Sequence, residues 1–370
     1  MADNRKRPAA KTSKRAKAKK KSKISKIIIF TVEILVISVL LGALWIVKDF
    51  GINEDGTKSG PLIVDFKEDD LVVNEQVQQN EHMQGYRNIA LFGVDSRSGE
   101  LTKRTLSDSI MIASINQDTG DIKLVSVYRD TYLNLSNDKY GKCNSAYSFG
   151  GAEQAIKMLN MNLDLDIKEF VTVGFEGLSS TIDELGGVWL DVDKEELKHI
   201  NSYQKCMAED LKDSWKPVEN TGYQLLNGLQ ATAYCRIRYR TGNDFARAAA
   251  QREVIQAIAT EAKKADITTL TKVANTVSSS VYTSLSMDEI IGMLGEIAKY
   301  NIVEEDGFPQ ADMRGSSTLG SKGSCVYAVD LDDNVKWLHE FLFQETDYEP
   351  SKEVKEYSNI IHNFVSQYTN

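Results

Sequence analysis

The arginines of this chain gather in one short segment. Residues 48–370 contain 10 arginines, and five of them lie between Arg236 and Arg252. Neighbouring guanidinium groups repel one another unless an anion joins them, and each presents a planar fork of donors that fits phosphate oxygens. The segment therefore predicts a phosphate-binding site. The alternative interpretation is a set of ion pairs with the many carboxylates of the chain.

The spacing within this segment groups the side chains. In the sequence CRIRYR (235–240) arginine occurs at every second position, and on a β-strand that period places all three guanidinium groups on one face. Arg247 and Gln251 are four residues apart and share one face of a predicted helix. Because helix N-termini also attract phosphate, the start of that helix would complete the anion site.

Aspartates occur at the ends of apolar runs. Asp95 closes the predicted strand 87–95, Asp108 opens the next strand, and Asp130 follows the third. In open α/β sheets the strand ends and adjoining loops line the ligand crevice, and two aspartates near a phosphate are typical of a Mg²⁺ site. Taken singly, each aspartate is a weak signal, because Asp at a strand end is most often a cap or turn residue. Together with the arginines they predict a metal–pyrophosphate site that acts by charge stabilisation.

The elements that would position these residues alternate between strand and helix. Apolar runs predict strands over 87–95, 108–116, 121–127, 170–173 and 188–192, and helical periodicity predicts helices over 150–161, 175–185, 244–265 and 286–300. The turn sequence QDTG (117–120) joins two of these strands into a hairpin. This pattern predicts an α/β fold with a mixed central sheet and helices on both faces.

The N-terminal segment has the composition of a membrane anchor. Residues 27–47 are 21 residues with a single ionisable group, Glu33, and as a helix would span about 30 Å, the hydrocarbon thickness of a bilayer. Residues 1–26 carry 12 Lys/Arg and one acid, which favours an N-terminus kept in the cytoplasm. We therefore expect an uncleaved transmembrane helix, a single-pass type II topology in the cell membrane and an extracytoplasmic catalytic domain.

Charge argues against a nucleic-acid partner. Residues 48–370 hold 32 Lys/Arg and 51 Asp/Glu, so only the tail is basic, and attraction to anionic membrane lipid accounts for the tail. We divide the chain into the basic tail 1–26, the transmembrane helix 27–47, an acidic stalk 48–86 with little fixed structure, a catalytic domain 87–345 and a C-terminal tail 346–370. The four cysteines (143, 206, 235 and 325) lack C-x-x-C spacing, and we expect mostly unpaired, buried thiols.

Several segments together resemble the LytR-CpsA-Psr family. They are FGVDSR (92–97), SDSIM (107–111), YRDT (128–131), LNGLQA (226–231), YCRIRY (234–239), GNDFAR (242–247) and AQR (250–252). Their order and spacing, the short basic tail and the single anchor all match that family, over about residues 87–345. The resemblance implies an extracytoplasmic phosphotransferase that moves a glycopolymer from a polyprenyl-pyrophosphate carrier onto peptidoglycan in a Gram-positive envelope, through a phosphodiester bond.

The resemblance also implies roles for individual residues. Asp95 and Asp108 would hold Mg²⁺ and, with Arg129, form the catalytic group. The pyrophosphate would be bound by six side chains, Arg97, Arg129, Arg236, Arg238, Arg247 and Gln251. An apolar tunnel through the α/β core would take the prenyl chain. The sequence leaves two alternatives open, a phosphohydrolase acting on the same donor and a non-catalytic regulator that binds the lipid pyrophosphate. It does not identify the polymer, the acceptor sugar or the oligomeric state.

Overall fold

A computed structural model describes residues 62–369 except 97–99, 212–213 and 239–243. The predicted basic tail 1–26 and transmembrane helix 27–47 lie outside the described residues, as do Arg97 and Arg240. Among the helices that the structure does describe, none combines the length and the apolar character needed to cross a bilayer.

The described chain alternates strands and helices. Its strands are β1 (Leu62–Ile63), β2 (Tyr86–Val94), β3 (Ser107–Asn116), β4 (Asp121–Val127), β5 (Tyr132–Asn134), β6 (Tyr140–Lys142), β7 (Glu169–Val173), β8 (Val188–Val192), β9 (Gly222–Leu226), β10 (Val281–Thr283), β11 (Asn301–Phe308), β12 (Arg314–Thr318) and β13 (Ser324–Ala328). Its helices are α2 (Glu75–Gln78), α3 (Asn144–Leu163), α4 (Phe175–Glu184), α5 (Lys194–Leu211), α6 (Gly228–Arg236), α7 (Asp244–Lys264), α8 (Ile267–Ser280), α9 (Met287–Gly295), α10 (Leu331–Phe343) and α11 (Lys352–Thr369).

Seven strands form one mixed sheet in the order β1-β10-β7-β2-β3-β4-β11. The β2–β3 and β3–β4 pairs are antiparallel, while β2 pairs with β7, and β4 with β11, in parallel. The predicted hairpin between the second and third apolar runs is therefore confirmed. Three two-stranded ribbons, β5–β6, β8–β9 and β12–β13, stand outside this sheet.

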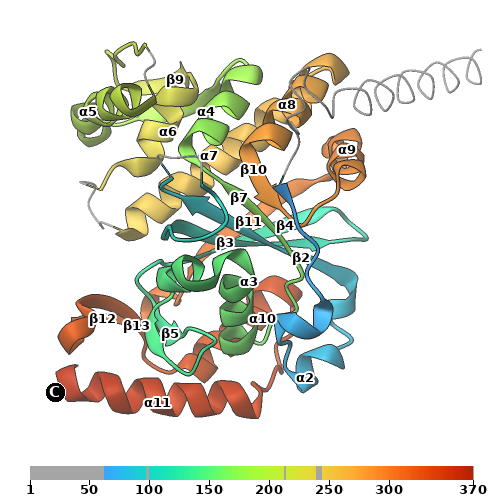
Figure 1. The fold of residues 1–370 in the computed structure, drawn as a ribbon, viewed down its shortest axis with the longest axis vertical. Coiled ribbons are helices and arrows are strands. Elements are labelled where there is room, and N and C mark those ends of the chain that lie inside the picture. The colour runs from blue at the N-terminus through green and yellow to red at the C-terminus, as the bar shows by residue number, and fades with distance from the viewer. Residues whose placement is uncertain (1–61, 97–99, 212–213, 239–243, 370) are drawn as a thin grey trace, which may run out of the picture. The chain divides into compact units, whose positions relative to one another are not determined.

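Strand alternation gives the sheet two different faces. Ala90, Phe92 and Ile110 are fully buried in the main core, where α3, α10 and α11 cover that face. The helices α4, α6 and α7 lie on the opposite side of the sheet (Figure 1). The predicted α/β class with a mixed central sheet and helices on both faces is thus confirmed.

A second, smaller core lies on the side of the sheet that carries α4, α6 and α7. There the ribbon β8–β9 packs its inward side chains, among them Val188, Leu190 and Leu226, against residues of α5, α6 and α7. Alternation along β8 and β9 leaves their other side chains exposed. This second core therefore supports α6 and α7, the helices that carry most of the clustered arginines.

The ends of the domain differ from our expectation. Within the predicted acidic stalk 48–86, Leu71, Val77 and Met83 are buried in the main core, and β1 pairs with β10. The segment is polar on average, yet these few apolar side chains are spaced so that all can be buried. The C-terminal tail 346–370 likewise contains α11, whose Val354 and Ile361 belong to the same core.

Candidate active site

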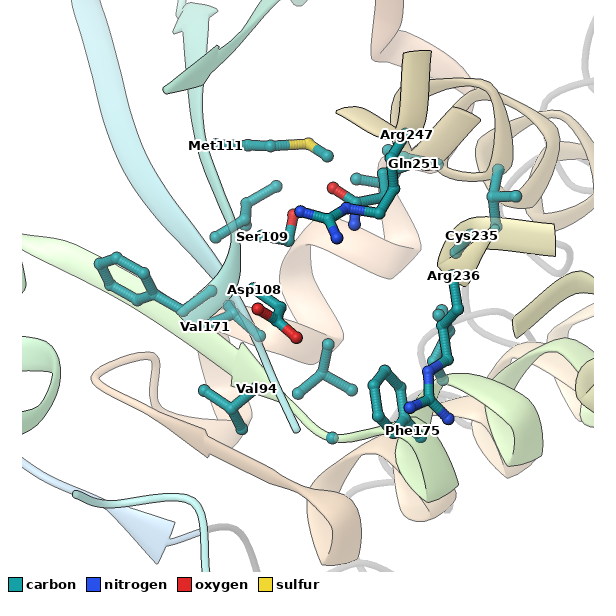
Figure 2. A pocket seen from close by; sticks show the side chains of 18 of the residues that line it. Val94, Asp108, Ser109, Met111, Val171, Phe175, Cys235, Arg236, Arg247 and Gln251 are labelled. Carbon is teal, nitrogen blue, oxygen red and sulfur yellow. The ribbon is translucent and has the colours of Figure 1, made fainter. Parts of the chain in front are cut away.

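A cavity of about 450 Å³ opens between the sheet and α4, α6 and α7. Its floor is made by β2, β3 and β7, which contribute Leu91, Phe92, Gly93, Val94, Ser109, Met111, Val171 and Val173. Its polar lining comes from Asp108, Arg236, Arg238, Arg247 and Gln251. Figure 2 shows Asp108, Arg247 and Gln251 turned toward the same space, with Arg236 beside Phe175. The cavity is thus apolar in one part and cationic in another.

A β-bulge directs Asp108 into this cavity. Gly93 pairs with Ser109, but the next residue, Val94, pairs with Ser107, so Asp108 is an extra residue on β3. Without the bulge Asp108 would share the core face with Ile110, two residues along the strand. The bulge turns it to the side of Ser109 instead. Gly93 is required at this position because a Cβ there would lie 2.9 Å from the Ser109 Cβ.

The described part of the arginine-rich segment, residues 235–238, is not a strand, which corrects our prediction for these residues. Helix α6 begins at a capping box formed by Asn227 and Gln230 and runs through Arg236. Ile237 then turns to extended backbone, which keeps Arg236 and Arg238 on the cavity side. The alternating pattern therefore predicted correctly that Arg236 and Arg238 lie on the same side, but it did not predict the secondary structure. Tyr239 and Arg240 lie outside the described residues.

Arg236 connects the cavity to Asp95. Its Nη2 atom lies 3.6 Å from an Asp95 carboxylate oxygen, and its guanidinium group stacks 4.1 Å from the Phe175 ring centroid. Arg238 is farther out and its side chain is 54% exposed, with Nη2 4.0 Å from Asp108 Oδ2. Both guanidinium groups keep donors available for a ligand because neither is fully engaged by these contacts.

Arg129 lies in a smaller hollow beside the cavity. That hollow shares Asp108, Arg247 and Gln251 with the cavity and adds Arg129 and Asp244. Arg129 Nη1 donates to Asp108 Oδ1 at 2.5 Å, and its Nε lies 3.5 Å from Asp244 Oδ2. Burial disfavours the charged guanidinium, but these carboxylates outweigh it and raise the pKa of Arg129. Arg129 therefore remains a fixed positive charge.

Arg247 is the most buried of these cations. Its side chain is 5% exposed, and burial followed by repulsion from Arg129 lowers its pKa. Asp244, three residues earlier on α7, approaches it to 2.9 Å. Asp244 contacts both guanidinium groups and Asp108 contacts Arg129, and the remaining N–H donors can bind a further anion, which a phosphate group would supply.

The sequence did not single out Asp244 or its pairing with Asp130. The two carboxyl groups are hydrogen-bonded, and Lys142 approaches Asp130 to 2.9 Å. Burial raises the pKa of Asp130, whereas Asp244 has a lowered pKa because Arg247, Asp130 and Arg129 outweigh its own burial. Both carboxyl groups lie beside Arg129, whose Nε is 3.5 Å from Asp244 Oδ2 and 3.9 Å from Asp130 Oδ2. In the sequence, Asp244 could have been noticed only as an acidic residue at the start of the helix predicted over 244–265.

The oxygen atoms around Asp95 and Asp108 include groups that a divalent cation can use as ligands. No cluster of three or more His, Cys, Asp or Glu side chains suited to a metal occurs among the described residues. Mg²⁺, however, is commonly held by one or two carboxylates together with phosphate oxygens and water. Asp95 follows the end of β2 and Asp108 lies at the start of the neighbouring strand β3, and the hydroxyls of Ser96 and Ser107 beside them are buried without a hydrogen-bond partner in the described structure. These oxygens fit such an ion.

The structure thus places most of the predicted site residues in one region. Asp108, Arg236, Arg238, Arg247 and Gln251 line the cavity, Arg129 lies in the adjoining hollow, and Asp95 contacts Arg236. The position of Arg97 is not described. The four cysteines form no disulfide bond, and three of them are buried, as expected, while Cys206 is exposed.

Comparison with known proteins gives a family match and curated relatives. Residues 58–340 match the model of the LytR-CpsA-Psr family. The chain is 27% identical over 220 residues to the polyisoprenyl-teichoic acid–peptidoglycan teichoic acid transferase TagT of Bacillus subtilis (strain 168), covering 58% of this chain and 65% of the relative. It is 30% identical over 219 residues to TagU of Oceanobacillus iheyensis, a transferase of the same description, covering 57% and 62%. The match spans less than two thirds of the length of these two relatives.

Solved structures show the same fold. The LytR-CpsA-Psr family protein YwtF (TagT) with bound octaprenyl pyrophosphate lipid superimposes with a TM-score of 0.53 at 21% identity, covering 73% of this chain and 95% of that one. At this identity the likeness concerns the arrangement of helices and strands.

Proposed function

Because the chain belongs to the LytR-CpsA-Psr family, we propose that it transfers a glycopolymer from a polyprenyl-pyrophosphate carrier to peptidoglycan through a phosphodiester bond. Two relatives are named as transferases of teichoic acid onto peptidoglycan, and a protein of the same fold holds octaprenyl pyrophosphate. The polymer class is therefore proposed to be teichoic acid or a related envelope glycopolymer.

One observation carries the proposal: a single cavity combines an apolar floor with an arginine-lined end. Leu91, Met111, Val171 and Val173 line the apolar part, and three arginines line the other. A ligand that satisfies both parts is an amphiphile with an anionic head and a hydrocarbon chain. A polyprenyl pyrophosphate has that composition. Neither a free sugar phosphate nor an uncharged lipid would use both.

The arginines act on the leaving group. As the acceptor hydroxyl attacks the phosphorus attached to the glycan, the P–O bond to the second phosphate breaks and polyprenyl phosphate leaves. Arg129, Arg236 and Arg247 neutralise the charge that develops on the departing oxygen, and they are already positioned by their carboxylate partners. Asp95 accepts the proton of the acceptor hydroxyl, and Gln251 orients the phosphate oxygens.

Mg²⁺ is proposed as the cofactor of this site. Asp95 and Asp108 would hold it, and the ion would supply further neutralisation of the pyrophosphate. Asp108 also forms an ion pair with Arg129, so the same carboxylate would link the magnesium site to the arginines. The hydroxyls of Ser96 and Ser107 would receive a polar partner from the ion or its water.

Anchoring in the cell membrane is also proposed. Residues 27–47 supply an apolar segment long enough for one span, and the 12 Lys/Arg of residues 1–26 favour a cytoplasmic N-terminus. The domain would then face the outside, where its lipid-linked donor and peptidoglycan meet. The anchor holds the domain close to the membrane that carries the donor.

The test mixes the full chain in detergent with Mg²⁺, a polyprenyl-pyrophosphate-linked glycan and peptidoglycan oligomers, and follows the glycan by mass spectrometry. We expect a covalent glycan–peptidoglycan phosphodiester, whose fragments identify the acceptor position. Free glycan phosphate without a conjugate would show that the protein hydrolyses the donor and does not transfer the glycan. Intact donor across several glycan classes would leave only a lipid-binding role, and omission of Mg²⁺ tests the metal separately.

A further inference from the structure

A second cavity, of about 440 Å³, lies on the other side of helix α7. We call it the α7–β11 groove. Residues of α7, including Glu253, Gln256 and Thr260, form one wall, the ribbon β8–β9 forms another, and the edge strand β11 completes it. The mechanism proposed above uses none of these residues.

An aromatic pair lines this groove. Trp189 of β8 and Tyr223 of β9 stack with their ring centroids 5.4 Å apart and their planes inclined by 24°. Trp189 is 42% and Tyr223 71% exposed. Of the four exposed positions on this ribbon, three carry large apolar side chains, Trp189, Tyr223 and Leu225, where a ribbon covered on one face ordinarily carries polar ones. Such an exposed apolar patch, rimmed by polar groups, marks a binding surface.

The bulge in β11 extends the apolar surface. The pairing of β11 with β4 shifts between Ile302 and Glu304, which leaves Val303 as an extra residue with 49% exposure. A bulge of this kind re-aims a side chain. The groove thus has apolar patches on two sides and polar groups from α7 between them.

The polar lining is acidic. Four glutamates line the groove (residues 253, 261, 304 and 305), and its described lining contains no lysine or arginine. Glu253 accepts a hydrogen bond from the Tyr234 hydroxyl at 2.6 Å, and Lys123 approaches Glu304 to 2.6 Å from outside the groove. Glu305 and Glu261 are paired in the same way, with Arg252 at 3.5 Å and Lys264 at 2.7 Å. The described lining itself therefore offers a phosphate no cation, while hydroxyl and amide donors would find acceptors.

We propose that the α7–β11 groove binds a saccharide unit of the peptidoglycan acceptor strand. The C–H groups on one face of a pyranose ring pack against the electron-rich face of an aromatic ring, and the hydroxyls and amides at its edge hydrogen-bond to carboxylate, amide and hydroxyl side chains. Trp189 supplies the aromatic face and Gln256, Thr260 and Glu253 supply the edge partners. The proposal rests on the transferase function, since it identifies the second substrate's binding surface.

The position of the groove suits an acceptor that extends beyond the reacting sugar. Helix α7 contributes Arg247 and Gln251 to the cavity and Gln256 and Thr260 to the groove, and its backbone cylinder with side chains is about 10 Å across. The groove and the cavity thus lie on two faces of one helix, as an acceptor strand of several sugars that contacts both requires. Binding of remote units then helps to orient the reacting hydroxyl.

The test compares variants of the full chain in detergent by co-sedimentation with peptidoglycan stripped of attached polymers, and separately by binding to glycopolymer released from its carrier. Trp189→Ala is expected to weaken peptidoglycan binding about tenfold, and Tyr223→Ala to act in the same direction. Trp189→Phe keeps an aromatic face and should retain most of the binding. Trp215→Ala removes an exposed tryptophan outside the groove and serves as the matched control.

The outcomes separate this proposal from the transferase function. Wild-type peptidoglycan binding by both alanine variants, with unchanged melting temperatures, would overturn the groove, and so would a loss of glycopolymer binding in place of peptidoglycan binding. In the transfer reaction, Trp189→Ala should raise the acceptor concentration for half-maximal rate with the donor dependence unchanged. Because sedimentation needs no chemistry, a wild-type chain that binds peptidoglycan through Trp189 yet forms no conjugate would refute only the transfer.

Discussion

One helix, α7, separates two cavities of nearly equal volume and opposite character. The cavity on one side has about 450 Å³ and is lined by three arginines and one aspartate, while the groove on the other has about 440 Å³ and is lined by four glutamates. The helical period divides the side chains: Arg247, Gln251 and Val254 face the first, Gln256 and Thr260 the second. The difference indicates two ligands, one anionic and amphiphilic, the other polar and free of phosphate.

The largest effect is expected from removing charge at the first cavity. Arg129→Ala and Asp108→Asn should each lower kcat of transfer by about 10²–10³-fold, as the loss of one preorganised donor does at other charged transition states. Steady-state rates with both substrates saturating measure this. Trp189→Ala in the groove should instead change the acceptor dependence and leave kcat within a few fold, which makes the two cavities functionally distinct.

The control for this comparison is Arg104→Ala. Arg104 is exposed and lies outside the lining of both cavities. Its removal should leave the rate near that of the wild type. A comparable loss of rate in Arg104→Ala would mean that the effect comes from a general loss of positive charge and not from specific contacts, and near-wild-type kcat in Arg129→Ala would remove that residue from the site.

A second, intermediate effect is expected from placing a carboxylate in each cavity. Val171 lines the apolar floor of the first cavity and Val303 lines the groove. Val171→Asp should raise the donor concentration for half-maximal rate at least about tenfold, because the prenyl chain would have to bury a charge. Val303→Asp should leave the donor dependence unchanged.

Binding of inorganic pyrophosphate, measured by calorimetry, is expected to persist in Val171→Asp, since the arginines remain. Val171→Thr, with nearly the same shape, guards against a simple folding defect and should show a smaller increase. Equal donor dependence in Val171→Asp and the wild type would place the prenyl chain elsewhere.

The smallest effect concerns the one acidic pair beside the first cavity. Burial raises the pKa of Asp130, so its protonated form is favoured in the folded state. The corresponding stability is present below the ordinary pKa of 3.8 and is lost as the pH rises through the folded-state value. Asp130→Asn keeps a hydrogen-bond donor toward Asp244 without titrating. The melting temperature of the wild type relative to this variant should therefore fall as the pH rises above 3.8.

A constant difference in melting temperature across that pH range would show that the Lys142 ion pair fully compensates the buried carboxylate. The effect is modest because Asp130 retains contact with solvent and with two cations.

The sequence predicted the central strands closely and the site in outline. The segment 121–127 coincides with β4, and its apolar residues lie mainly in the half of the strand that is buried. The grouping of Arg236, Arg238, Arg247 and Gln251 followed from side-chain period and charge alone. These are properties that a residue and its near neighbours determine.

Features that depend on distant partners were not predictable. The CRIRYR segment alternates as a strand does, yet the capping box at Asn227 begins a helix that carries through Arg236. The groove is made by β8, β9, α7 and β11, which are separated by long stretches of sequence and meet only in the folded chain. The polar composition of residues 62–85 likewise concealed three apolar side chains that are buried in the main core.

The bulge at Asp108 makes the site depend on residue count as well as on residue type. Deleting either Ser107 or Asp108 would restore regular pairing with β2 and leave the cavity without its carboxylate. Changes in length between residues 96 and 106 have no such consequence, because the pairing from Ser109 onward fixes the strand. The carboxylate of the cavity therefore tolerates changes in the length of the preceding segment but not the loss of one residue from the start of β3.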